Sequence, residues 1–197
     1  TGEREELNGR RTYGSPIFNF VPYDEPRRQL EGGEADEVGI VLTQSYRTMF
    51  YYNESLEKYE MSQYNSSRGT EEETVDENNG QRVAFDNVFV LFAPMSIYDG
   101  THDKGGLKEF NLYEVSIGYY FCDGRYELIR WTKGGPDSSL VLWVNDTTET
   151  SLLVNPGTSY IALVDNIQLE PFYNSMMAGT GTDDAASGAI ISDEQDT

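Results

Sequence analysis

The feature that most constrains this sequence is a series of short, alternating apolar segments between residues 110 and 164, separated by strong turn signals. The segments cover residues 110–121, 125–132, 139–144, 151–154 and 159–163. Four turn sequences separate them, namely Asp123-Gly124, Gly134-Gly135-Pro136-Asp137, Asn145-Asp146 and Asn155-Pro156-Gly157. Asp-Gly between two alternating segments is the strongest short-range signal of a hairpin. This part of the chain is therefore predicted to form an antiparallel sheet.

Further alternating segments extend this pattern toward the N-terminus. They cover residues 17–21, 38–42, 48–53, 57–62 and 83–94, whereas residues 65–80 and 96–109 are predicted to be loops. No convincing helix of ten residues is found, and residues 169–177 are predicted to be a last strand or a loose segment. The predicted fold class is all-β, a mostly antiparallel sandwich or partly closed barrel with long acidic loops.

The composition predicts three parts along the chain. Residues 1–16 are expected to be a flexible lead-in or linker, residues 17–177 a single β domain, and residues 178–197 a disordered acidic tail. The start at Thr1, without a signal peptide, favours a fragment whose targeting segment has been removed. No apolar run approaches the roughly 20 residues that a membrane-spanning helix needs.

The charge balance restricts the possible partners. The chain carries 34 acidic and 14 basic residues, a formal net charge of −20. Nucleic acids and anionic membranes are disfavoured as partners, because both require Lys and Arg to neutralise phosphate. The same acidity is compatible with attraction of cations and with adaptation to high salt. The single cysteine, Cys122, excludes an intramolecular disulfide.

Candidate catalytic and metal-binding residues form no complete constellation. Asp36 and Asp86 lie within predicted strands, and the simplest interpretation is that each faces outward. His102 is the single histidine and lies in a glycine-rich loop. Asp76-x-Asn78-x-Gly80 only partly fits the start of a calcium loop, and zinc is disfavoured by one cysteine and one histidine. No catalytic residue, metal or cofactor is therefore predicted.

Several short motifs together resemble the C-terminal domain of the YerB-like lipoproteins, a bacterial family of uncharacterised function. They are Phe18-x-Phe20, Ala35-Asp36-x-Val38-x-Ile40, Tyr51-Tyr52-Asn53, Val83-x-Phe85-x-Asn87-Val88-x-Val90, Trp131-x-Lys133 and Asn155-Pro156-Gly157-Thr158. Two departures are Met61, where family members often carry Arg, and the longer acidic loop 65–80. The resemblance implies an extracytoplasmic, membrane-tethered origin, a further N-terminal domain and no assigned activity.

Five residues are the candidate ligand-binding set, namely Trp131, Lys133, Tyr59, Asn87 and Asn155. Trp131 and Lys133 are two residues apart on a strand and so share one face. Aromatic side chains provide large contact areas for sugars or peptides, but they also fill the cores of β domains. Both interpretations, a ligand surface and a packed core, remain open from the sequence.

The sequence leaves three hypotheses of function. The first is a non-catalytic, extracytoplasmic module of a bacterial envelope lipoprotein, anchored to the membrane or cell surface through a lipid outside this chain. Its partners would be the N-terminal domain of the same polypeptide, another protein or a cell-wall ligand. The second is a cell-wall glycan or peptide hydrolase that uses Asp/Glu pairs. The third is a structural spacer.

Overall fold

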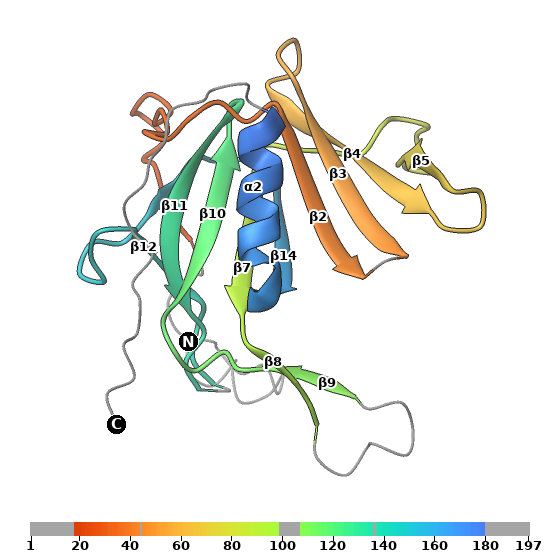
Figure 1. Ribbon diagram of the computed structural model, residues 1–197. Coiled ribbons are helices and arrows are strands. Elements are labelled where there is room, and N and C mark those ends of the chain that lie inside the picture. Colours follow the sequence, from red (N-terminus) through yellow and green to blue (C-terminus); the bar gives the residue numbers. More distant parts are fainter. Residues whose placement is uncertain (1–17, 44, 99–106, 136, 180–197) are drawn as a thin grey trace, which may run out of the picture.

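The computed structural model describes residues 18–43, 45–98, 107–135 and 137–179 (Figure 1). Two five-stranded sheets dominate it. The central sheet has the order β12 (Val141–Val144), β11 (Arg125–Thr132), β10 (Ser116–Cys122), β7 (Asn87–Ala93) and β14 (Ser159–Asp165). The outer sheet has the order β2 (Glu37–Thr43), β3 (Tyr46–Asn53), β4 (Lys58–Asn65) and β5 (Thr70–Glu73), and β6 (Ala84–Phe85) also pairs with β4.

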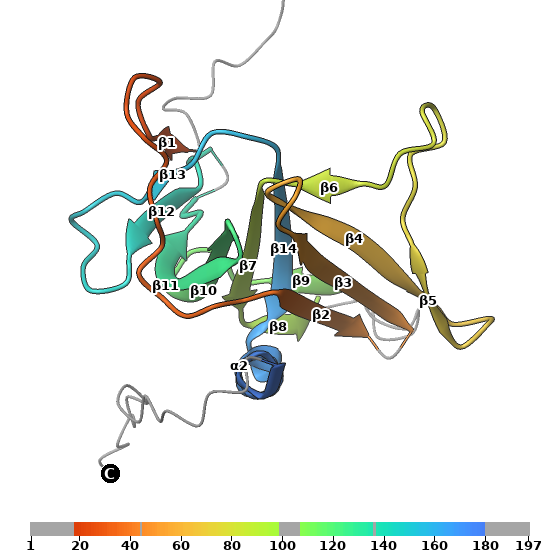
Figure 2. The same cartoon turned by 90° about the horizontal axis from the view of Figure 1, so that it is seen from above.

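The remaining strands form two small sheets of two strands each. In one, β1 (Asn19–Phe20) runs parallel to β13 (Leu153–Val154), and in the other β8 (Met95–Ile97) pairs with β9 (Lys108–Phe110). Figure 2 shows the central sheet between β1 and β13 on one side and the outer sheet on the other. The predicted all-β class is thus confirmed as a sandwich, without a closed barrel in the described residues.

The hairpin between β10 and β11 is the one that the sequence predicts most strongly. Cys122 pairs with Arg125, so Asp123 and Gly124 alone form the turn. Their φ angles are 52° and 69°, the left-handed values that a type I′ turn requires. The remaining pairs of the central sheet are antiparallel except β7 with β14, which run parallel.

Strand β7 lies between two hydrophobic cores, and all of its residues are buried. Val88, Val90 and Phe92 belong to the core shared with the outer sheet, where they meet residues such as Phe50 and Tyr59. The alternate residues Phe89, Leu91 and Ala93 face the second core. The second core also contains Tyr120, Cys122, Ile129, Trp131, Leu152 and Val154. Both faces of the central sheet are therefore covered at β7.

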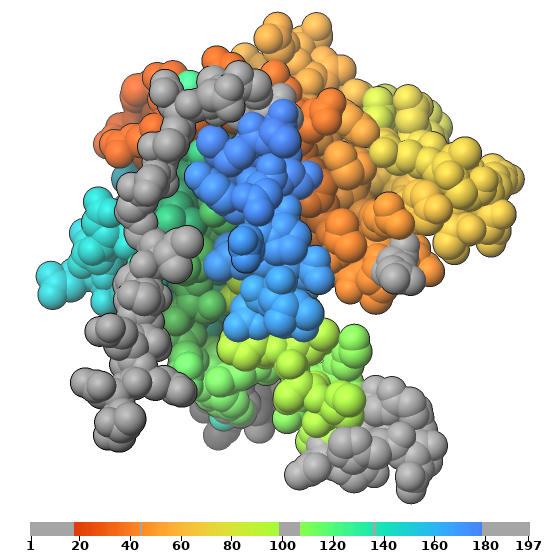
Figure 3. Space-filling view, viewed as in Figure 1, coloured from red at the N-terminus to blue at the C-terminus, as the bar shows by residue number. Residues whose placement is uncertain are grey.

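The C-terminal prediction was wrong, because residues 169–177 are neither a strand nor loose. A short 3₁₀ turn, η2 (Asn166–Gln168), leads into an α-helix, α2 (Leu169–Gly179). Its apolar residues recur at helical spacing, as Leu169, Phe172, Tyr173, Met176 and Met177, and all five contribute to the core between the sheets. Figures 1 and 3 show α2 lying between the central sheet and β2.

Smaller differences concern loops and boundaries. The loop predicted at residues 65–80 contains β5, and parts of the loop predicted at 96–109 pair as β8 and β9. The lead-in 1–16 and the tail predicted from residue 178 lie outside the described residues, except that α2 continues to Gly179. Among the described residues, no helix has the length and apolar character needed to cross a bilayer.

Candidate functional site

A buried polar centre lies where β7, β10 and the segment after β13 meet. Asn87, Tyr120 and Asn155 are all fully buried. The Tyr120 hydroxyl donates to Oδ1 of Asn87 at 2.7 Å and accepts from the backbone N–H of Asn155 at 3.1 Å. Nδ2 of Asn87 donates to the Asn155 carbonyl at 3.0 Å. These three residues therefore satisfy one another inside the core, where an unpaired polar group is costly.

The segment before β2 is attached to this polar centre. Asn155 exchanges two hydrogen bonds with the backbone of Arg28, each 2.8 Å long. The Arg28 guanidinium pairs with the carboxylate of Glu127, and Arg27 pairs with Asp123 at 2.7 Å. A bidentate Arg–carboxylate pair of this kind fixes geometry as well as charge. Residues 27–28 are thereby held over the ends of β10 and β11.

The single cysteine belongs to the same centre. Cys122 is fully buried, and its Sγ accepts from Nη2 of Arg27 at 3.3 Å and from Nδ2 of Asn155 at 3.4 Å. Burial raises the pKa of the Cys122 thiol above its usual value. Because the thiolate is the reactive form, this raised pKa favours an inert, structural cysteine.

A second polar cluster lies beside the first. The carboxylate of Asp86 accepts from the backbone N–H and the hydroxyl of Thr158, both at 2.7 Å, and from Nζ of Lys58 at 3.1 Å. Burial alone would raise the pKa of Asp86, but these hydrogen bonds outweigh it and hold the pKa below its usual value. The prediction that Asp86 faces outward was wrong, because this residue is only 9% exposed.

Aromatic rings form a continuous stack from this centre to the surface. Tyr120 stacks on Phe89 with ring centroids 4.7 Å apart, and Phe89 stacks on Phe18 at 5.2 Å. Phe18 then meets Phe20 edge-on at 5.6 Å. Tyr120 and Phe89 are fully buried, whereas Phe20 is 45% exposed. The stack therefore becomes solvent-exposed at β1.

Strand β14 extends this exposed surface. Ile161 lies opposite Phe89 in the parallel register, and Leu163 lies opposite Leu91, so both side chains share the face on which Phe18 packs. Ile161 is 43% exposed, and Leu163 is partly buried. We call Phe18, Phe20, Ile161 and Leu163 the apolar patch. Its members come from two ends of the sequence, and none of them carries a charge.

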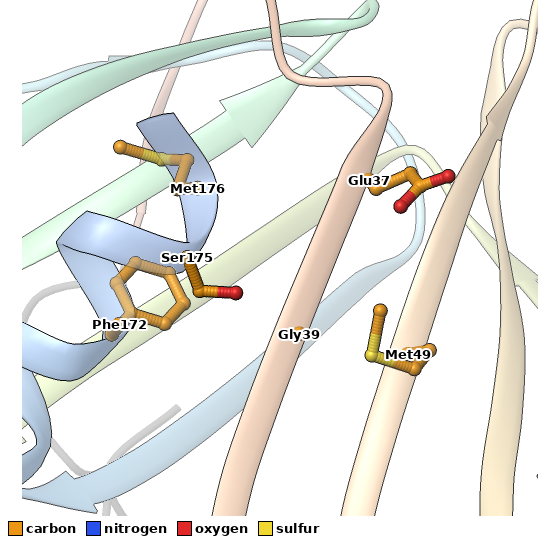
Figure 4. Close-up of a pocket in the computed structure, with 6 residues that line it drawn as sticks. All are labelled: Glu37, Gly39, Met49, Phe172, Ser175 and Met176. Atoms are coloured by element: carbon orange, nitrogen blue, oxygen red, sulfur yellow. The ribbon is translucent and has the colours of Figure 1, made fainter. Parts of the chain in front are cut away.

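Two hollows lie elsewhere on the molecule. A cavity of about 40 Å³ separates α2 from β2 and β3, and Figure 4 shows Phe172 and Met176 on one side of it and Gly39 and Met49 on the other. This volume suits one water molecule. A more open hollow of about 380 Å³ lies along β4 and β5 and includes Glu72 and Glu73. The first is too small for an organic ligand, and the second is open and lined mostly by polar and acidic residues, unlike a typical small-molecule site.

Four of the five predicted ligand-binding residues are buried, and Lys133 is partly exposed. Trp131 is buried, with its indole N–H donating to the Ile117 carbonyl at 2.9 Å, and Tyr59 is buried, with its hydroxyl donating to the Ala35 carbonyl at 2.9 Å. Lys133 donates to the carbonyls of Gly135 and Ser138. Of the five, only Asn87 and Asn155 are brought together. Their contacts are those of a structural framework, and ligand binding by this set stays a prediction.

Two carboxyl groups in the described part of the chain have clearly shifted pKa values, and neither fits the role of a general acid. The carboxyl groups of Glu72 and Asp86 have lowered pKa values, whereas a general acid requires a raised one. No group of three His, Cys, Asp or Glu residues in the described ranges could hold a metal ion. His102 lies outside the described residues. The exposed apolar patch is therefore the feature with the clearest capacity for recognition.

Comparison with protein families matches residues 38–161 to the family described as "Protein of unknown function (DUF3048) C-terminal domain". The chain belongs to this family. The predicted resemblance to the YerB-like family is confirmed by this match and by a solved structure. The DUF3048 match runs from Val38 in β2 to Ile161 in β14, so it contains the polar centre but excludes β1 and α2.

The solved structure is that of the YerB protein from Bacillus subtilis. It shares 22% identity with this DUF3048 domain and has a TM-score of 0.52. The match covers 70% of this chain and 43% of the YerB chain. At this identity the likeness shows the fold alone. No curated protein sequence matches the chain.

Proposed function

We propose that this DUF3048 domain is a non-catalytic binding module of an extracytoplasmic envelope lipoprotein, and that it contacts a protein partner through the apolar patch. The extracytoplasmic location and the lipid anchor are part of this proposal and rest on the family resemblance of the sequence. Cell-wall glycan or peptide is the alternative ligand within the same proposal.

One observation carries the proposal. Phe18 and Phe20 form the outer end of an aromatic stack whose other end, Tyr120, is held by hydrogen bonds to Asn87 and Asn155. Rigid aromatic side chains provide contact area with little loss of conformational entropy on binding. Exposed apolar side chains that adjoin one another, unlike isolated ones, mark interaction sites on soluble domains. Phe18 and Phe20 contact each other, and Ile161 and Leu163 lie opposite β7 residues on the face where Phe18 packs.

The test is a binding comparison with matched variants. The chain, its Phe20→Ser variant and its Ile167→Ser variant would be used to capture proteins from an envelope extract, and each captured protein would then be purified and titrated. Ile167 is 70% exposed and lies outside the patch, so its variant controls for a general loss of apolar surface. We expect Phe20→Ser to weaken binding at least tenfold and Ile167→Ser to leave it unchanged.

Titrations with muropeptides and glycan fragments complete the test. Saturable binding that depends on Phe20 would identify a cell-wall ligand in place of a protein. Equal binding by all three chains, or no specific ligand of either kind, would count against the patch as a recognition surface.

A further inference from the structure

We infer that the partner of the apolar patch is the domain that precedes this one in the same polypeptide. The inference rests on the proposed function, because it names the partner of the same surface. Three features of the described residues support it: the position of the patch, its attachment to the rest of the fold, and the charge of the chain.

The position of the patch places it beside any preceding domain. Phe18 is the first described residue, and it belongs to the patch. A domain on the N-terminal side would be tethered to this end of the fold, and a tether raises the effective concentration of such a domain at the patch. At such concentrations a small apolar contact is sufficient for docking.

The comparisons indicate that relatives of this chain contain additional sequence. The matched family is described as a C-terminal domain. The match covers 43% of the YerB chain, so more than half of that solved chain lies outside it. The YerB chain thus contains further sequence beyond the matched part, and the inferred partner corresponds to such a part.

The attachment of β1 makes the patch a fixed surface. The N–H of Val21 donates to the Val154 carbonyl at 2.9 Å, and Asn19 and Phe20 pair in parallel with Leu153 and Val154. Asn155, the next residue, is held by Tyr120 in the polar centre. Strand β1 is thus hydrogen-bonded to β13, which is anchored to the core. The patch residues of β1 are therefore held in place in the absence of a partner.

Charge favours a sister domain over a second copy of this chain. Two copies that meet through their patches would bring together two bodies with a formal net charge of −20 each. This repulsion opposes self-association except at high salt. The four patch residues are uncharged, so the surface of the partner domain that contacts them should be apolar. Basic residues around that surface would complement the acidic charge of this chain.

The test uses the longer polypeptide that contains both domains. Hydrogen–deuterium exchange is measured on it and on the 197-residue chain alone, and the amides of residues 18–21 and 159–165 are compared. We expect these amides to exchange at least tenfold more slowly in the longer polypeptide, while β5 and η2 are unchanged. Equal exchange at residues 18–21 and 159–165 in the two proteins, or protection confined to another surface, would overturn the inference.

A second experiment uses a protease site introduced into the longer polypeptide before residue 18, followed by size-exclusion chromatography after cleavage. The wild type and Ile167→Glu are expected to co-elute as a pair, whereas Ile161→Glu and Phe20→Glu are expected to separate. Circular dichroism confirms that each variant is folded. Separation of the wild type, co-elution of every variant, or dimerisation of the 197-residue chain through the patch would overturn the inference.

These outcomes are separable from failure of the proposed function. If the two domains do not dock but Phe20→Ser still abolishes binding to another purified protein, only the sister-domain inference fails. If neither docking nor any other binding depends on the patch, both fail.

Discussion

The hydroxyl of Tyr120 lies 2.7 Å from Oδ1 of Asn87, and both residues are fully buried in the centre of the sheet. Burial raises the pKa of Tyr120, which keeps the hydroxyl protonated as a donor. Tyr120→Phe would leave the Asn87 oxygen and the Asn155 N–H without this partner. We expect a loss of about 1–3 kcal/mol in the free energy of unfolding, measured by urea denaturation.

A matched control exists for this substitution. Tyr23 is completely exposed, so Tyr23→Phe removes the same hydroxyl without uncovering a buried group. The urea concentration at the unfolding midpoint should be the same for Tyr23→Phe and the wild type. Equal midpoints for Tyr120→Phe and the wild type would show that the polar centre contributes nothing to stability.

Asp86 should make stability depend on acid pH. Its folded pKa is lowered, chiefly by hydrogen bonds from Thr158 and Lys58 acting against the effect of burial. A lowered folded pKa contributes stability above the unfolded value of about 3.9, and that contribution is lost as the pH falls through the folded pKa. Asp86→Asn should therefore destabilise the domain by about 1–3 kcal/mol at pH 7. The free energy of unfolding of this variant should also fall less steeply below pH 4 than that of the wild type, as measured by urea denaturation between pH 2 and 7.

Gly157 should tolerate no side chain. Its φ is 145°, and a Cβ at this position would lie 2.4 Å from Cβ of Asp86. Gly157→Ala should cost at least about 2 kcal/mol, since it combines backbone strain with a steric clash. Gly80 also has a positive φ, 69°, but an added Cβ would meet nothing within 4 Å. Gly80→Ala should cost only about 1 kcal/mol, so similar thermal shifts for the two variants would disprove the clash.

Helix α2 should be an essential part of the core. Phe172 is 7% exposed, and its ring centroid lies 5.4 Å from those of Phe92 and Tyr119. Phe172→Ala should cost about 3–5 kcal/mol in chemical denaturation. Asn174 lies on the exposed side of α2, so Asn174→Ala should change stability by less than about 0.5 kcal/mol. A wild-type midpoint for Phe172→Ala would show that α2 is dispensable.

Salt should stabilise the domain. The chain has 34 acidic and 14 basic residues, so its negative charges repel one another most strongly in the compact folded state. Dissolved salt screens this repulsion. We expect the melting temperature to rise by several degrees between about 0.05 and 1 M NaCl. The double variant Glu71→Gln with Glu77→Gln should show a shallower dependence on salt. A melting temperature that falls with NaCl would show that attractive ion pairs dominate.

Local signals made much of the fold predictable. Asp123-Gly124 specified its hairpin because the turn conformation is a property of those two residues. Leu169, Phe172 and Met176 recur at helical spacing, and their packing in the core between the two sheets stabilises α2 where a strand or loose segment is predicted.

The candidate site was much less predictable, because its partners are distant in the sequence. Asn87 contacts a residue 68 positions away, and Asp86 contacts one 72 positions away. A polar residue within an apolar strand gives no indication of whether such a partner exists. The alternation of Phe18 and Phe20 with Asn19 predicts a strand. It does not indicate that Phe18 packs on Phe89 while Phe20 is exposed, which only the structure shows.

The burial of both faces of β7 has a consequence for variation among relatives. A strand with one solvated face can accept polar replacements at every second position, whereas each position of β7 lies in one core or the other. Residues 87–93 should therefore be the segment in which natural and laboratory mutations are most strongly selected against.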